Sequence, residues 1–198
     1  MKAVAELWSG YADVITAGLR DMVVTDRTGG DVPAQDAFAR WVAMTHAIQE
    51  RDGQLFIIGN GGSAGMASHM VTDALALANL RANALNDPTT LTAAANDRSF
   101  DQTFALQLER LARAGDLLIG ISQSGNSSNI VRAVESSRSR SLRTITLSAM
   151  RTDNRCRALG DLNFYVPLAR YGWAQSAHQV ILHYWFDQYL DQHGQGAV

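Results

Sequence analysis

The chain has 198 residues, of which 46% are hydrophobic, so it is long enough to bury one sizeable core as a single domain. Its formal charge is −2 and it contains no basic block, which argues against a nucleic-acid partner. The single cysteine, Cys156, excludes an internal disulfide, and no apolar run approaches the roughly 20 residues needed to cross a bilayer. With Glu6 too early for a signal peptide, we expect a cytoplasmic protein without a membrane partner.

Hydrophobic spacing predicts an alternation of helices and strands. The expected helices cover residues 2–24, 33–51, 63–80, 89–95, 100–114, 127–140 and 173–192. The expected strands cover residues 55–58, 84–86, 116–121, 143–147 and 163–166. Strands that alternate with helices imply an α/β fold with a parallel sheet covered on both faces. We expect one domain over residues 1–198, with a helical pair over 1–52 and a sheet core with a C-terminal helix over 53–198.

A glycine-rich turn follows the first expected strand. Residues 59–65 read Gly-Asn-Gly-Gly-Ser-Ala-Gly and lead into a helical pattern that carries His69 and Asp73. A strand, a glycine-rich turn and a helix N-terminus together present backbone N–H groups and the positive end of the helix dipole to an anion. The turn is not a P-loop, because no Gly-Lys-Ser/Thr follows it.

The same turn also fits the dinucleotide-binding pattern G-x-G-x-x-A. Gly59, Gly61 and Ala64 match the pattern, and Asp87 follows at a distance suited to a ribose-binding acid. However, the segment 86–88, Asn-Asp-Pro, is more typical of a turn that opens the next helix. Because a lone glycine pattern is weak and leaves the next polar turn unexplained, we favour a phosphate site over a dinucleotide site.

A second polar turn follows the strand that ends at Ile121. Residues 122–128 read Ser-Gln-Ser-Gly-Asn-Ser-Ser, and hydroxyls with free N–H groups at a helix start suit a phosphate monoester. An ordinary Ser N-cap with solvated neighbours would have the same composition. Both turns follow strands of one parallel sheet, so they are expected at the same edge, and this pairing favours phosphate binding.

Two helices carry residues with the chemistry of an acid/base or metal site. His69 and Asp73 are four residues apart and therefore share one face of their helix. Gln175 and His183 are eight residues apart on the last helix, which separates them by about 80° around its axis. This angle is small enough for both side chains to point into one cavity. Two imidazoles, a carboxylate and an amide suit a hard-to-borderline metal. Each residue alone also has an ordinary explanation, such as a surface His–Asp contact. His178 is an outside candidate, since a core histidine fits its position equally well.

In this order, the motifs resemble the sugar isomerase (SIS) domain, and within it the bacterial phosphoheptose isomerases. The segments that carry the resemblance are 59–64, His69, 91–93, 96–97, 115–122 and 124–127. It extends from the first helices to the last without a large insertion. It implies a flavodoxin-like three-layer sandwich with N-terminal helices, and the isomerisation of sedoheptulose 7-phosphate to glycero-manno-heptose 7-phosphate. It also implies a homotetramer, for which Trp8, Tyr11 and Trp41 would supply apolar surface.

The resemblance implies a role for individual residues. Asp73 is the expected base and His183 the partner acid/base, and a divalent metal, expected to be zinc, is held by His69, Asp73, Gln175 and His183. The residues implied to bind the substrate or its phosphate are Asn60, Gly61, Gly62, Ser63, Asp97, Ser122, Gln123, Ser124, Ser127 and Gln175.

Several positions depart from the pattern of this family. Asp73 stands where those enzymes carry glutamate, Gln123 replaces a threonine, and the segment around Gln175 lacks the usual arginine, isoleucine and glutamate. Some close relatives are non-catalytic, including a protein that binds the bacterial replication initiator, and these tend to lose the carboxylate and the last-helix histidine. Because both positions remain ionisable here, we expect an enzyme. The alternative is a phosphosugar-binding or protein-binding module without turnover.

Overall fold

The structure, a computed structural model, describes residues 8–193. Its strands are β1 (Val23–Asp26), β2 (Gln54–Gly59), β3 (Arg81–Asn83), β4 (Leu117–Ser122), β5 (Arg143–Ala149) and β6 (Leu162–Val166). Its α-helices are α1 (Trp8–Arg20), α2 (Ala34–Glu50), α3 (Gly62–Leu77), α4 (Pro88–Asp97), α5 (Ala105–Leu111), α6 (Ser128–Ser139) and α7 (Tyr171–His193). Two short 3-10 helices are η1 (Phe100–Gln102) and η2 (Arg155–Ala158).

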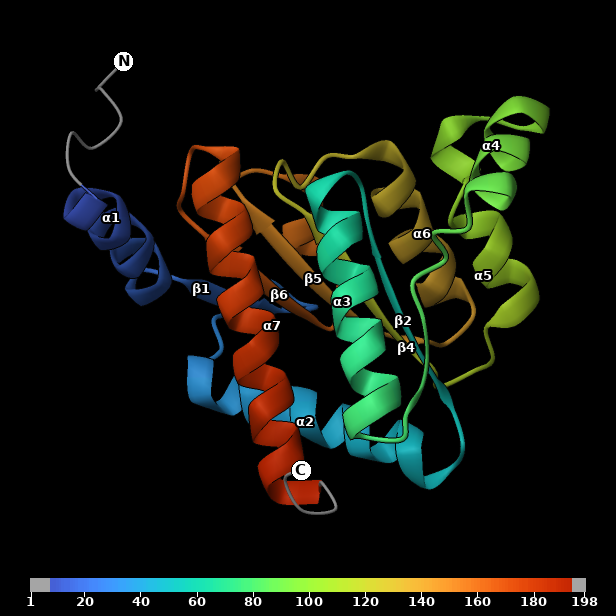
Figure 1. Cartoon of the computed structure of the whole chain (residues 1–198), viewed down its shortest axis with the longest axis horizontal. Coiled ribbons are helices and arrows are strands. Elements are labelled where there is room, and N and C mark those ends of the chain that lie inside the picture. Colours follow the sequence, from blue (N-terminus) through green and yellow to red (C-terminus); the bar gives the residue numbers. More distant parts are fainter. Residues whose placement is uncertain (1–7, 194–198) are drawn as a thin grey trace.

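The six strands form one sheet in the order β1-β6-β5-β4-β2-β3 (Figure 1). All neighbouring strands are parallel except β1, which pairs with β6 in the antiparallel sense. The central strands are buried on both faces, and Ile57, Ile119 and Ile145 lie side by side across β2, β4 and β5. This burial explains why the segment 55–58 is continuously apolar. The expected parallel sheet is therefore confirmed.

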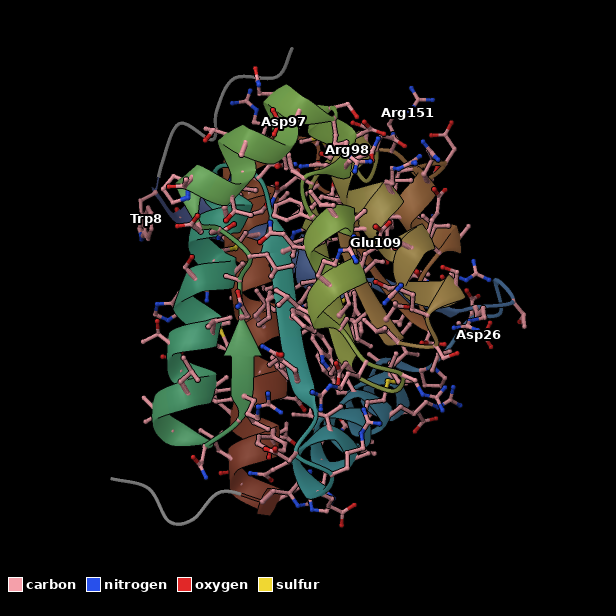
Figure 2. All side chains as sticks on the ribbon, turned by 90° about the vertical axis from the view of Figure 1, so that its right-hand side faces the viewer. Trp8, Asp26, Asp97, Arg98, Glu109 and Arg151 are labelled. Carbon is pink, nitrogen blue, oxygen red and sulfur yellow. The ribbon has the colours of Figure 1, made fainter. Side chains whose placement is uncertain are left out.

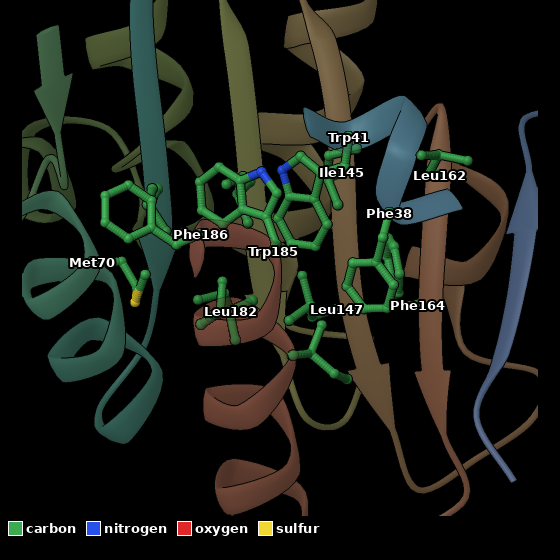
Figure 3. Close-up of a cluster of buried hydrophobic side chains, with 14 of the residues drawn as sticks. Phe38, Trp41, Met70, Ile145, Leu147, Leu162, Phe164, Leu182, Trp185 and Phe186 are labelled. Carbon is green, nitrogen blue, oxygen red and sulfur yellow. The ribbon is translucent and has the colours of Figure 1, made fainter. Parts of the chain in front are cut away.

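Helices cover both faces of the sheet and bury two hydrophobic clusters. α2, α3 and α7 pack on one face, and α5 and α6 pack on the other (Figure 1). In the first cluster the ring of Trp41 stacks on that of Trp185 with centroids 4.6 Å apart, and Phe164 of β6 lies against Trp41 (Figure 3). These layers confirm the three-layer α/β sandwich. Among residues 8–193, none of the helices combines the length and apolarity needed to cross a membrane.

The N-terminal segment differs from the sequence-based expectation. The sequence predicts helix to about residue 24 and a loop from residue 25, whereas α1 ends at Arg20 and β1 begins at Val23. Val24 is buried in the main core and pairs with Phe164 of β6. Consecutive β-branched residues favour extended backbone when one face of the strand is buried. Within residues 8–52 the chain therefore contributes an edge strand as well as helices, and the first part of the expected helix, over residues 2–7, lies outside the described residues.

Two other expected elements are shifted or divided. The short strand expected over 84–86 instead lies at β3, and Leu85 has a positive φ of 54° that is incompatible with a strand. The helix expected over 100–114 is divided into η1 and α5. Neither change alters the edge of the sheet where β2 and β4 end and where α3, α6 and α7 begin (Figure 1).

Candidate active site

The glycine-rich turn brings α3 close to the end of β2. A Cβ on Gly59 would lie 2.5 Å from the Cβ of Ser63, so a glycine is needed for this close approach. Gly61 takes a positive φ of 54°, which also favours glycine. The helix begins with no side-chain cap at Gly61. No side chain therefore caps α3 at the place where an anion would bind, while the N–H groups of Ser63 and Ala64 donate to the backbone oxygens of Asn60 and Gly61 at 3.0 Å.

Side-chain hydrogen bonds connect the two turns. The buried Ser63 hydroxyl donates to Oε1 of Gln123 at 2.8 Å. The amides of Asn60 and Asn129 bond to each other in both directions, at 2.8 and 2.9 Å. The pairing of Asn129 with Asn60 was not predicted, because a single asparagine in the first turn of a helix has no distinctive sequence pattern. These contacts place both turns at one edge of the sheet, as the sequence predicts.

The second turn gathers three hydroxyls around the start of α6. The Oγ of Ser122 donates to the Oγ of Ser127 at 3.1 Å and lies 3.5 Å from the Oγ of Ser124. Ser127 occupies the N-cap position of α6, but its side chain makes no capping hydrogen bond. An ordinary Ser N-cap therefore does not account for this turn, because the N–H of Ile130 in the first turn of α6 instead donates to Oδ1 of Asn129 at 3.0 Å. The serine hydroxyls are placed to donate to an anion.

His69, Asp73 and His183 come together between α3 and α7. Nε2 of His69 lies 3.3 Å from Oδ2 of Asp73, and the rings of His69 and His183 meet edge-on with centroids 5.4 Å apart. The potential metal-ligand atoms of all three residues lie within 4.8 Å of one another. The Asp73 side chain is 24% exposed and that of His69 is 55% exposed, so the group faces a solvent-accessible surface.

Gln175 lies at the turns, beside the first residue of α3. A Cβ on Gly62 would lie 2.5 Å from Nε2 of Gln175, whereas His183 lies beside His69, seven residues further along α3. Gln175 and His183 are eight residues apart, so they are separated by about 12 Å along the axis of α7. The prediction of a shared cavity considered only the angle between them around the helix. The Gln175 amide therefore lies against the start of α3, whereas His183 lies with His69 and Asp73.

Two acidic candidates lie on α4. Asp97 is exposed at the end of α4, where its carboxylate accepts a hydrogen bond from Asn96 at 2.9 Å (Figure 2). Asp87 caps the start of α4 by accepting from the backbone N–H of Thr90 at 2.7 Å. That bond lowers the pKa of Asp87 below its usual value. Asp87 therefore opens a helix, as its sequence context predicts, which removes the acid required by the dinucleotide interpretation.

His178 belongs to the core. It is fully buried, and its Nε2 lies 3.1 Å from the backbone oxygen of Ser148. Burial lowers the pKa of the His178 imidazole to about 4, so the ring is neutral near pH 7. A buried neutral ring held by a strand carbonyl fits the structural explanation of this histidine better than a role in proton transfer.

Comparison with known proteins identifies the family of the chain. The model of the SIS domain family matches residues 30–149. The chain therefore belongs to the SIS domain family.

Its relatives include phosphoheptose isomerases. The chain is 37% identical over 140 residues to the enzyme of Helicobacter pylori, an alignment that covers 68% of this chain and 72% of that protein. It is 39% identical over 182 residues to the enzyme of Nitratidesulfovibrio vulgaris, which covers 89% and 76% respectively. The structure of the Neisseria gonorrhoeae phosphoheptose isomerase superposes with a TM-score of 0.74 at 30% identity, over 91% of this chain and 96% of that one.

Proposed function

We propose that the chain is a ketose–aldose isomerase that converts sedoheptulose 7-phosphate to glycero-manno-heptose 7-phosphate. The observation that carries the proposal is the convergence of His69, Asp73 and His183 within 4.8 Å on the two helices that begin at the phosphate-binding edge. The names of the relatives support the seven-carbon substrate. A binding module without turnover is not favoured, because it would require no such convergence of ionisable groups.

The reaction moves a proton from C1 to C2 of the sugar through an enediol. It needs one group that takes the C–H proton and a second that transfers a proton at the oxygens. We assign the first role to the carboxylate of Asp73, which His69 orients at 3.3 Å. We assign the second role to His183, whose ring faces that of His69.

The two turns form the proposed binding site for the substrate phosphate. We assign the phosphate to the hydroxyls of Ser63, Ser122, Ser124 and Ser127, which line the turns at the starts of α3 and α6. His69 lies seven residues beyond Gly62, about 10 Å along α3, a span suited to an extended sugar phosphate. The proposed substrate path is completed by Asn60, Gly61, Gln123, Gln175 and Asp97.

Replacing Ser124 or Ser127 with alanine is expected to raise KM by an amount equivalent to roughly 1.5–3 kcal/mol, because each change removes a hydrogen bond to a charged phosphate. The melting temperature should hardly change, since both side chains are only partly buried in a loop. Steady-state kinetics and thermal unfolding check both statements. Ser128→Ala, at an exposed neighbour, is the matched control. Unaltered sugar-phosphate affinity in both loop variants would show that the second turn is structural.

The donor set of the three-residue group fits a divalent metal. Two imidazole nitrogens and one carboxylate oxygen suit zinc, and three protein ligands are typical of a catalytic zinc site. We propose that His69, Asp73 and His183 hold the ion, with Gln175 as the fourth expected ligand. When bound, the metal would polarise the substrate carbonyl and stabilise negative charge on its oxygen.

We further propose that the protein is a cytoplasmic homo-oligomer, with a tetramer as the expected form. Trp8 of α1 is 81% exposed, and Tyr171, Val180 and Tyr184 are exposed on α7, whereas Trp41 is buried in the core. Val180 and Tyr184 line a surface groove of about 590 Å³ that also includes His183. A second copy that covers this apolar face would therefore also enclose the active site. The buried free thiol of Cys156 fits a reducing compartment.

Small-angle scattering at micromolar concentration is expected to give the mass of an oligomer. Val180→Asp should lower that mass, because it places a charge on the apolar face. The control Leu111→Asp, at an exposed leucine of α5 on the other side of the sheet, should leave the mass unchanged. A monomeric mass for the unmodified chain would contradict the proposed assembly.

A panel of ketose phosphates with five, six and seven carbons tests the proposed activity. Each ketose phosphate is incubated with the protein and the aldose product is separated and identified. We expect the highest kcat/KM for sedoheptulose 7-phosphate. Binding of these sugars without turnover of any of them would favour the binding module instead.

A further inference from the structure

A polar cavity lies where β2 and β4 begin. This is the edge of the sheet opposite to the starts of α3, α6 and α7 (Figure 1). It has a volume of about 460 Å³ and is formed by the end of α2, the starts of β2 and β3, and the segment after α5. Its charged lining residues are Arg51, Arg81, Arg110, Arg113, Asp52 and Asp116. The six-residue strand β2 places this cavity about 20 Å from the phosphate-binding turns.

Two of the guanidinium groups are held in place by the backbone. Nη1 of Arg51 donates to the carbonyl of Ala114 at 3.0 Å, and Nη1 of Arg81 donates to the carbonyl of Asp52 at 2.7 Å. Gly115 has a positive φ of 84°, and a Cβ there would overlap the Arg51 guanidinium. These contacts use only part of the donor capacity of each guanidinium, so both groups are ordered and can still donate hydrogen bonds.

The other two guanidinium groups have no side-chain or backbone partner among the described residues. Within residues 8–193, the side chains of Arg110 and Arg113 are exposed and form neither an ion pair nor a hydrogen bond. Asp116 instead pairs with Arg51 at 3.7 Å and also accepts from the backbone N–H groups of Gln54 at 2.9 Å and Arg113 at 2.7 Å. Asp52 is engaged with Arg81 at 3.3 Å. The cavity therefore retains uncompensated positive charge.

We propose that this cavity is a second anion site that binds a small di- or polyphosphate. Arginine forks match the geometry of phosphate oxygens, and two ordered and two free guanidinium groups suit a ligand with at least two negative charges. The catalytic and phosphate-binding candidates lie at the other edge of the sheet. The ligand therefore binds independently of the sugar, and its binding stabilises the folded chain by linkage.

Pyrophosphate is the probe, and calorimetric titration at low ionic strength is the measurement. The protein carries Ser124→Ala and Ser127→Ala in every titration, so that the first phosphate site is weakened. We expect Arg110→Ala with Arg113→Ala to raise the Kd for pyrophosphate at least about tenfold, as the loss of charge-assisted hydrogen bonds requires. The matched control, Arg20→Ala with Arg40→Ala, removes the same charge from exposed positions on α1 and α2 and should leave the Kd unchanged.

Three results would overturn the proposal. Pyrophosphate that does not bind would remove the site. An equal rise of the Kd in both double variants would show that pyrophosphate responds only to the overall charge of the protein and not to the arginines of the cavity. Malonate that binds as tightly as pyrophosphate would show that the cavity does not select phosphate. None of these measurements depends on isomerase turnover, so failure of the proposed activity leaves this test intact.

Discussion

Replacing Asp73 with asparagine is expected to lower kcat by roughly 10²–10⁴-fold, the loss associated with removal of a general base. Asparagine keeps the size and polarity of the side chain but has no basic lone pair to accept the C–H proton. The Kd for sugar phosphate should change little, because the turns that hold the phosphate are unaltered. Steady-state kinetics and calorimetric binding on the same preparation separate these two quantities.

Two further variants make the interpretation specific. His183→Gln should cause a comparable loss of kcat, since it removes the second proton-transferring group. Asp73→Glu restores the longer side chain of the family; reduced activity would show that the site has adjusted to the shorter carboxylate. If Asp73→Asn turns over substrate as fast as the parent chain, the base lies elsewhere and His69 is the next residue to replace.

Trp185→Ala is expected to lower the free energy of unfolding by roughly 3–5 kcal/mol. Trp185 is fully buried, stacks on Trp41 at 4.6 Å, and donates its indole N–H to the hydroxyl of Thr45 at 3.1 Å (Figure 3). The substitution leaves a cavity between α2 and α7 and removes that hydrogen bond. Denaturant-induced unfolding monitored by circular dichroism measures the loss.

The control for this substitution is Leu75→Ala on α3. Leu75 is exposed, so its truncation should change the free energy of unfolding by no more than about 0.5 kcal/mol. If Trp185→Ala were no more destabilising than this control, the aromatic stack would not be what holds α2 and α7 to each other.

Most of the sheet could be predicted from the sequence, because buried parallel strands are continuous apolar runs and each is followed by a turn and a helix. The run 55–58 with the glycines after it shows this most clearly. β1 could not be predicted in the same way. It has only four residues, directly follows the amphipathic pattern of α1, and forms only because β6 offers an edge to pair with.

The candidate site was predictable to different degrees. The His69–Asp73 pair follows from spacing along one helix, whereas the approach of His183 follows from the packing of α7 on α3, which the spacing of residues does not encode. Gln175 and His183 are also separated along the axis of α7, and the prediction from their angle around the helix did not take this separation into account. The arginine-lined cavity was not predictable, because its four arginines come from three segments that are separate in the sequence, around Arg51, Arg81 and residues 110–113.

The most direct test of the account is the fate of the C–H proton during turnover. Sedoheptulose 7-phosphate is incubated with the protein in deuterium oxide, and the products are followed by proton NMR. Enediol chemistry with Asp73 as the base predicts an aldose phosphate that carries deuterium at C2, and no such product with Asp73→Asn. Recovery of unlabelled ketose alone with the parent chain, although the sugar binds, would contradict the assignment of this protein as an isomerase.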